Sequence, residues 1–114
     1  MAVKSPTDRL DEILTFFQIS RAQLAQTLGV PEQAVDRWAT GRGEPRGVNL
    51  RELGRLGELM DLLLQVKGST DAAQAWLAEP NAAFGGSSPM QIVLTRGPLQ
   101  VLNYLEMPDE PAYA

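Results

Sequence analysis

The chain of 114 residues contains neither cysteine nor histidine. Without cysteine, nothing in the sequence indicates an oxidising compartment. Without either residue, zinc sites of the usual kind are excluded, and most acid–base and thiol mechanisms lose their usual side chains. These absences disfavour an enzyme, and we expect no cofactor, no metal and no small-molecule substrate.

The chain also lacks a long hydrophobic run. Its longest apolar stretch, around Leu59 to Val66, contains Asp61 and Gln65. This stretch is far shorter than the roughly 20 apolar residues that span a bilayer. The N-terminus has no apolar segment typical of a signal peptide. We therefore expect no membrane contact and a cytoplasmic location.

Positive charge is scarce in the second part of the chain. Residues 68–114 contain one arginine and five acidic residues, whereas residues 1–67 contain nine basic and nine acidic ones. Within the first part, residues 37–55 carry a local charge of +3. A locally basic segment of an acidic chain can still meet phosphate, because steering depends on the local potential. The acidic C-terminal end favours a different, basic partner.

Apolar residues recur at helical spacing through most of the chain, and no segment alternates as a strand does. Ser20 with Gln23 forms the pattern of a capping box, and Asn49 is expected to cap a long fourth helix. Gly54 and Gly57 lie inside that helix, where another backbone, from this chain or a second copy, is expected to approach closely. The predicted architecture is all-α, with a helix-turn-helix bundle over residues 1–67 and a three-helix C-terminal module over residues 68–114.

The segment from Ser20 to Gly41 predicts a helix-turn-helix. Ala25 is small where two helices must approach, and Gly29 can take positive φ in the turn. Val35 and Trp38 would anchor the second helix from behind. This spacing is typical of DNA-binding helix-turn-helix proteins and resembles the Xre/Cro-type repressor fold.

The second helix of this motif would enter the major groove by its first turns. Gln33 could contact adenine, and Arg37 could contact guanine or phosphate, whereas Glu32 and Asp36 either read cytosine or repel DNA. The candidate DNA-binding residues are Arg21, Glu32, Gln33, Asp36, Arg37, Arg42 and Arg46. Helix pairs with a glycine turn also occur in bundles without a DNA role, where arginines lie on a solvated face. If the chain binds operator DNA, we expect a homodimer that reads two half-sites.

A second motif occupies the segment from Trp76 to Gly97. It reads W-L-x-x-P-N-x-x-F, then G-x-x-P, then an apolar helix that ends in glycine. Its matching positions are Trp76, Leu77, Pro80, Asn81, Phe84, Gly86, Pro89, Ile92, Val93, Leu94 and Gly97. This pattern resembles the C-terminal toxin-binding domain of the Xre/MbcA/ParS antitoxin family, in which an Xre-like helix-turn-helix precedes it.

The resemblance implies a partner, a RES-domain toxin that degrades NAD⁺. It also implies that the C-terminal segment of the antitoxin obstructs the entrance of the toxin's NAD-binding pocket. Family members often end in a small-aromatic-small tripeptide, as Ala112-Tyr113-Ala114 does, although Glu110-Pro111 stands here where family tails commonly carry glycine. The candidate toxin-binding residues are Trp76, Pro80, Asn81, Phe84, Pro89, Gly97, Asp109, Glu110, Tyr113 and Ala114.

Several of these residues also have a purely structural interpretation. Trp76 and Phe84, like Ile92 and Leu102, are typical core residues, and Asn81 is a typical loop cap. The sequence therefore predicts an antitoxin of a type II toxin–antitoxin pair that represses its own operon. The alternative is a helix-turn-helix transcriptional regulator whose C-terminal helices serve only for dimerisation. An enzyme is the third and least favoured class.

Overall fold

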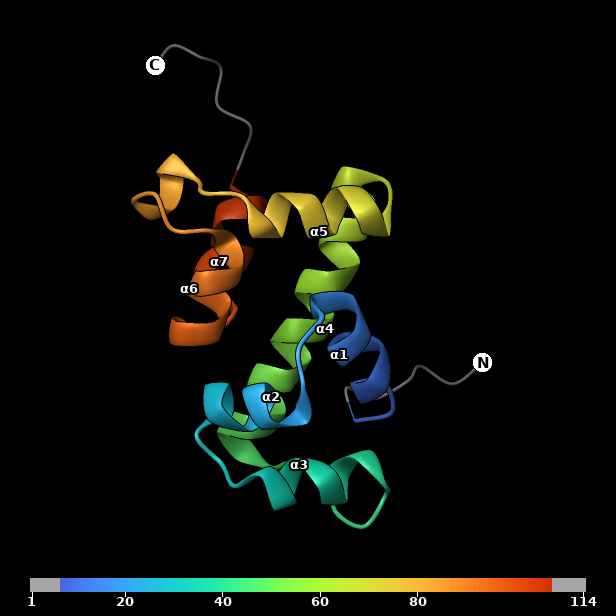
Figure 1. Cartoon of the computed structure of the whole chain (residues 1–114). Coiled ribbons are helices and arrows are strands. Elements are labelled where there is room, and N and C mark those ends of the chain that lie inside the picture. The colour runs from blue at the N-terminus through green and yellow to red at the C-terminus, as the bar shows by residue number, and fades with distance from the viewer. Residues whose placement is uncertain (1–6, 108–114) are drawn as a thin grey trace.

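The computed structural model describes residues 7–107, and this range contains seven α-helices, one 3-10 turn and no strand. The all-α prediction is confirmed. Figure 1 shows the order of the elements along the chain and their places around the long helix α4. The elements are α1 (Leu10–Phe17), α2 (Arg21–Leu28), α3 (Glu32–Ala39), α4 (Gly47–Lys67), α5 (Thr70–Ala78), η1 (Ala82–Phe84), α6 (Pro89–Arg96) and α7 (Leu99–Glu106).

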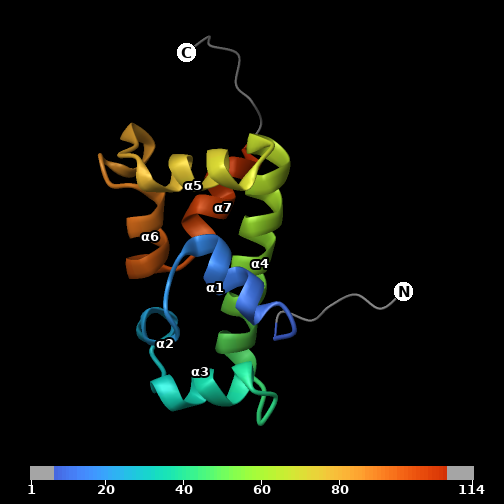
Figure 2. The ribbon, with the colours of Figure 1, turned by 45° about the vertical axis from the view of Figure 1, so that its right-hand side comes forward.

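Helix α4 is the axis of the molecule. In Figures 1 and 2, α3 lies at one end of this helix and α5 at the other, while α1 lies along its length. Its inward face is a row of leucines and Met60 at helical spacing, and these side chains are almost completely buried. Both the N-terminal helices and the C-terminal module pack on this one helix.

The start of α4 differs from the prediction. We expected Asn49 to cap the helix, but the helix begins at Gly47 and has no side-chain cap. The N–H groups of Asn49 and Leu50 both donate to the carbonyl oxygen of Arg46, at 3.1 and 3.4 Å, which is the pattern of a first turn. Because Arg46 is extended and the helix follows it directly, Asn49 lies inside the first turn and not at its cap.

Gly57 lies on the face of α4 that packs against α1. The residue is buried, and a Cβ at this position would lie 3.7 Å from Nη1 of Arg9 and 3.8 Å from Cδ1 of Ile13. The guanidinium of Arg9 crosses above it and binds Asp61 with two hydrogen bonds of 2.7 and 2.8 Å. The atoms that face Gly57 are thus the ends of side chains at ordinary contact distances, and the close approach of another backbone predicted there is wrong.

The C-terminal module shares a hydrophobic core with the helix-turn-helix bundle. Helix α6 packs against α2, α7 packs against α4, and α5 packs against both α4 and α6. The buried residues from Leu10 to Leu102 form a single cluster. The predicted boundary after residue 67 stays a prediction, and in the structure it falls at Gly68, which ends α4 with a φ of +86°.

Within the described residues, no helix is both long enough and apolar enough to cross a membrane.

Candidate functional site

The helix-turn-helix forms as its local sequence predicts. The hydroxyl of Ser20 accepts a hydrogen bond from the backbone N–H of Gln23, whose side chain accepts one from the N–H of Ser20. Gly29 ends α2 in the left-handed conformation with a φ of +73°. Behind the turn, Val35 is fully buried and Trp38 nearly so. Helices α2 and α3 are therefore fixed against the core at the angle that this turn sets.

The predicted DNA-binding residues lie along the outer side of α3 and the loop after it. In α3, Glu32, Gln33 and Arg37 are exposed, and in the loop so are Arg42 and Arg46. The side chain of Arg37 runs along this loop, since a Cβ at Gly43 would lie 3.8 Å from its Nε atom. Arg37 lies in the last turn of α3, so the structure places it and the loop arginines at the C-terminal end of this helix and not in the first turns that were expected to enter a groove.

The remaining two candidate DNA-binding residues, Arg21 and Asp36, form an ion pair with each other. Nη1 of Arg21, the first residue of α2, lies 3.3 Å from Oδ1 of Asp36 in α3. Both side chains are partly exposed, so this ion pair adds little stability. It connects the two helices of the motif at the surface and gives the carboxylate of Asp36 a cationic partner within the chain.

The loop after α5 is organised by Asn81. Its side-chain oxygen accepts a hydrogen bond of 2.9 Å from the N–H of Ala83, and its own N–H donates one of 3.0 Å to the carbonyl of Ser87. Its carbonyl oxygen accepts bonds from the N–H groups of Phe84 and Gly86, at 2.9 and 3.0 Å. The loop-capping interpretation of Asn81 therefore describes the structure, and these bonds close the loop around the buried ring of Phe84.

Pro89 and Gly97 stand at the two ends of α6. Pro89 is fully buried in the first turn, and Ser88 before it forms a second capping box with Gln91. Gly97 ends the helix with a φ of +89° and a ψ of 176°. A Cβ at Gly97 would lie 3.1 Å from Oε1 of Glu52, so α6 ends directly beside α4.

An aromatic cluster joins α5, η1 and α7. The rings of Trp76 and Tyr104 are stacked with centroids 6.3 Å apart, and Phe84 meets Tyr104 edge-on at 5.2 Å. Nζ of Lys67 lies 5.2 Å from the centre of the Trp76 ring, within the range of a cation–π contact. Phe84 is buried, Trp76 is half-buried and Tyr104 is exposed, so the cluster runs from the core to the surface.

Two other predicted core residues of the module, Ile92 and Leu102, are buried as expected. Pro80 is exposed at the end of α5. The tail candidates Asp109, Glu110, Tyr113 and Ala114 lie outside the described residues. The structure thus brings Trp76, Asn81 and Phe84 together at one end of the module, while Gly97 lies at the other end of α6.

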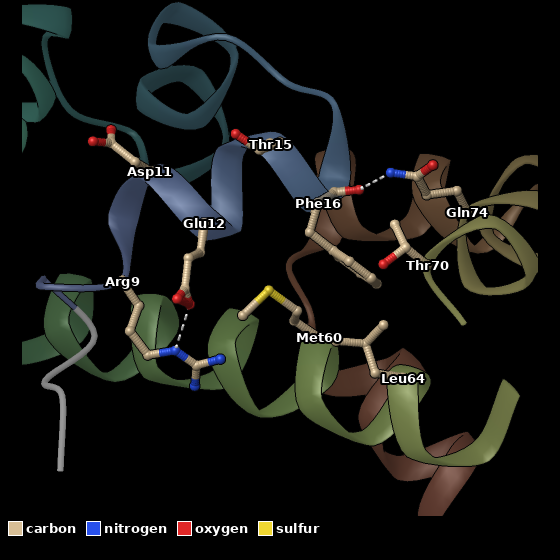
Figure 3. Close-up of a pocket in the computed structure, with 9 residues that line it drawn as sticks. All are labelled: Arg9, Asp11, Glu12, Thr15, Phe16, Met60, Leu64, Thr70 and Gln74. Atoms are coloured by element: carbon tan, nitrogen blue, oxygen red, sulfur yellow. Dashed lines mark hydrogen bonds and ion pairs between the residues drawn. The ribbon is translucent and has the colours of Figure 1, made fainter. Parts of the chain in front are cut away.

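A separate groove of about 620 Å³ lies between α1, α4 and α5, and Figure 3 shows its lining. The amide of Gln74 donates a hydrogen bond of 2.9 Å to the carbonyl of Phe16 at one end, and Arg9 bonds to Glu12 at the other. No predicted site residue lines this groove. Within residues 7–107, no three acidic side chains gather in a way that could hold a metal ion.

Sequence reasoning missed Lys67, Tyr104 and Glu52 as members of these sites. Tyr104 follows the buried Val101 by three residues on the same side of α7, which could have indicated an aromatic at the edge of the apolar face. The contacts of Lys67 and Glu52 have no comparable local signal, because Trp76 and Gly97 belong to other elements whose packing local spacing does not specify.

The fold and these surfaces define an all-helical protein in which a helix-turn-helix bundle precedes a small helical module. Residues 59–107 match the family described as the antitoxin Xre/MbcA/ParS C-terminal toxin-binding domain. This segment of the chain is therefore a domain of the Xre/MbcA/ParS antitoxin family. The match begins inside α4 and ends with α7.

The whole fold is similar to a chain in the crystal structure of the M. tuberculosis MbcT–MbcA toxin–antitoxin complex. The TM-score is 0.64 at 20% identity, over 91% of this chain and 93% of that one. A curated relative, the 6-hydroxy-3-succinoylpyridine 3-monooxygenase HspA of Pseudomonas putida (strain DSM 28022 / S16), is 39% identical over 51 residues. These residues are 44% of this chain but only 16% of HspA, so the chain spans a small part of that relative's length.

Proposed function

We propose that the chain is an antitoxin that binds a RES-domain toxin and stops it from degrading NAD⁺. The match of residues 59–107 to a toxin-binding domain supports this proposal most directly. The likeness of the fold to a chain of a toxin–antitoxin complex agrees with it. The 51 residues shared with HspA are too small a part of that protein to carry its oxygenase activity over.

The proposed mechanism is obstruction of the toxin's NAD-binding pocket by residues 108–114. This segment carries Asp109, Glu110 and Tyr113. A pocket that binds a dinucleotide phosphate needs cations, and carboxylates on a short tail are suited to pair with them. The module 59–107 would hold the toxin in place while the tail covers the entrance.

We further propose that a homodimer of the chain binds operator DNA through α3. The exposed side chains of Gln33 and Arg37 in α3, and of Arg42 and Arg46 in the loop after it, support this part of the proposal. Phosphate contacts from the loop arginines would set the register, and contacts from α3 would read bases. The ion pair of Arg21 with Asp36 reduces the negative charge that α3 would bring to the DNA.

The competing function is a transcriptional regulator whose C-terminal helices serve only for dimerisation. Co-expression with the adjacent open reading frame separates the two. An antitoxin should co-purify with a RES-domain product of that frame and protect the cells that express it. A chain that forms a tight dimer on DNA but no complex with any RES-domain protein would be the regulator.

The DNA-binding part is tested by Arg37→Ala. Loss of a base or phosphate contact should weaken operator binding about fivefold to a hundredfold, the effect of roughly 1–3 kcal/mol. Toxin binding by the same variant should be unchanged, because α3 lies at the far end of α4 from α5. Unchanged operator affinity would count against a role for Arg37.

A further inference from the structure

We propose that the side chains of Lys67, Trp76, Tyr104 and Met107 form a surface, the aromatic ledge, that binds the body of the toxin. This inference rests on the proposed function and assigns to the toxin a second contact apart from the C-terminal tail. The ledge belongs to three helices, because Lys67 ends α4, Trp76 lies in α5, and Tyr104 lies in the last turn of α7. Met107 follows that turn directly, with its N–H 3.4 Å from the carbonyl oxygen of Tyr104.

The ledge is exposed on one side and supported on the other. Tyr104 exposes 36% of its surface and Met107 exposes 58%. Beneath them, the buried ring of Phe84 meets Tyr104 edge-on, and the stacked ring of Trp76 lies beside it. The hydrogen bonds of Asn81 fix the loop that carries Phe84. The tyrosine ring is therefore held in place before any partner arrives.

This composition is typical of the energetic centre of a protein interface. Tyrosine, tryptophan and methionine are enriched there, and a ring that is already ordered loses little conformational entropy on binding. Lys67 adds a cation, and the contact with the Trp76 ring orients its ammonium group. A partner that covers the ledge would gain apolar contact at its middle and a charged contact at its edge.

The length of the C-terminal tail indicates that the toxin is the partner that covers the aromatic ledge. Tyr113 is the sixth residue after Met107. Because an extended chain spans at most about 3.3–3.6 Å per residue, the six residues from Met107 to Tyr113 can span no more than about 22 Å. A toxin whose pocket receives Tyr113 must therefore come within that distance of the end of α7, where Tyr104 and Met107 are exposed.

Two exposed apolar side chains of the N-terminal part, Val48 and Leu50, lie too far away to serve. Val48 and Leu50 are in the first turn of α4, at the opposite end of this helix from Lys67. A helix of 21 residues is about 30 Å long, so these two side chains lie beyond the reach of the tail. Leu50 is accordingly a matched control, since it is exposed and apolar but distant from the ledge.

The test measures the affinity of full-length variants for the RES-domain product of the adjacent frame, purified in a catalytically inactive form. Tyr104→Ala, Met107→Asp and Lys67→Glu each change the ledge, and Leu50→Ala is the control. A fifth variant changes only the tail, with Asp109→Asn, Glu110→Gln and Tyr113→Ala combined. Thermal unfolding of every variant checks the fold, and Met107→Asp tests the ledge without disturbing the aromatic packing.

We expect Tyr104→Ala and Met107→Asp to weaken toxin binding at least tenfold, Lys67→Glu to weaken it severalfold, and Leu50→Ala to bind like the unchanged chain. The tail variant should keep measurable affinity, and Met107→Asp should weaken it further. The inference is overturned if folded Tyr104→Ala and Met107→Asp bind the toxin as tightly as the unchanged chain, or if the tail variant loses all binding. Failure of the unchanged chain to bind would instead refute the proposed function.

Discussion

The hydroxyl of Thr27 donates a hydrogen bond of 3.3 Å to the carbonyl oxygen of Leu94. This bond joins α2, the first helix of the helix-turn-helix, to α6 of the toxin-binding domain. The two helices also pack against each other, and their buried side chains belong to one cluster. The toxin-binding domain therefore packs directly on the part of the chain that we propose to bind DNA.

Thr27→Val tests what this contact contributes. The substitution keeps the shape of the side chain and removes the donor, so the free energy of unfolding should fall by about 1 kcal/mol, the usual value of one hydrogen bond. Urea denaturation measures the change. Thr95→Val is the control, because the exposed hydroxyl of Thr95 bonds only within its own helix, to the carbonyl of Gln91 at 2.7 Å. If the free energy of unfolding falls equally in the two variants, the contact between α2 and α6 contributes no more than a hydrogen bond within one helix.

Gly97→Ala should destabilise the chain by about 2 kcal/mol, because backbone at this φ and ψ is open essentially to glycine alone. Gly43→Ala is the control, since its Cβ would make only ordinary contacts of 3.8 Å with Arg37. The added Cβ at Gly97 would also approach Glu52 at 3.1 Å, but that carboxylate is the flexible end of a side chain. Adding Glu52→Ala should therefore restore little stability, and full restoration would show that the contact, and not the backbone, causes the loss.

Asn81→Ala should lower the free energy of unfolding by about 1 kcal/mol, the usual cost of a lost cap. It removes the acceptor for the N–H of Ala83 but leaves the backbone bonds of the loop. Asn81→Asp keeps an acceptor at the same place and should restore both stability and toxin affinity. A variant with aspartate that is stable but cannot bind toxin would mean that the amide of Asn81 contacts the toxin directly.

The pair of Arg9 and Asp61 predicts a pH dependence of stability. The two hydrogen bonds from the Arg9 guanidinium hold the pKa of Asp61 below its usual range. A carboxylate with a lowered pKa stabilises the fold above its ordinary pKa, and the contribution is lost as the pH falls toward its folded value. Because Asp61 is more than half exposed, we expect Asp61→Asn to cost at most about 1 kcal/mol at pH 7.

Chemical denaturation at pH 7 and near pH 3 checks this prediction. The difference in stability between Asp61→Asn and the unchanged chain should shrink as the pH falls below about 4, the ordinary pKa of aspartate. A difference that stays the same throughout this range would assign the effect to packing and not to the charge of Asp61.

The features that sequence reasoning predicted well are those that a few neighbouring residues determine. Ser20 and Gln23 form a capping box, and Gly29 ends α2, because each depends on geometry within one helical turn. Asn49 was wrongly expected to cap α4, since its preference for a cap is weak beside the extended backbone of Arg46 that starts the helix earlier.

The relations between distant residues could not be predicted in this way. The contacts of Thr27 with Leu94 and of Glu52 with Gly97 join segments far apart in the sequence. They depend on how the C-terminal helices pack on α2 and α4, which local spacing does not specify. The same holds for Tyr104, whose place in the aromatic cluster follows from the position of α7 beside α5 and the loop that carries Phe84.

The most direct test of the proposed function is the rate of NAD⁺ breakdown by the purified RES-domain toxin in the presence of an equal amount of this chain. The full chain should suppress the breakdown, because we propose that its tail covers the pocket entrance. A chain without Pro108–Ala114 should still bind operator DNA but suppress the breakdown much less. Undiminished NAD⁺ breakdown with the full chain bound would contradict the antitoxin function, and equal suppression by the shortened chain would contradict obstruction by the tail.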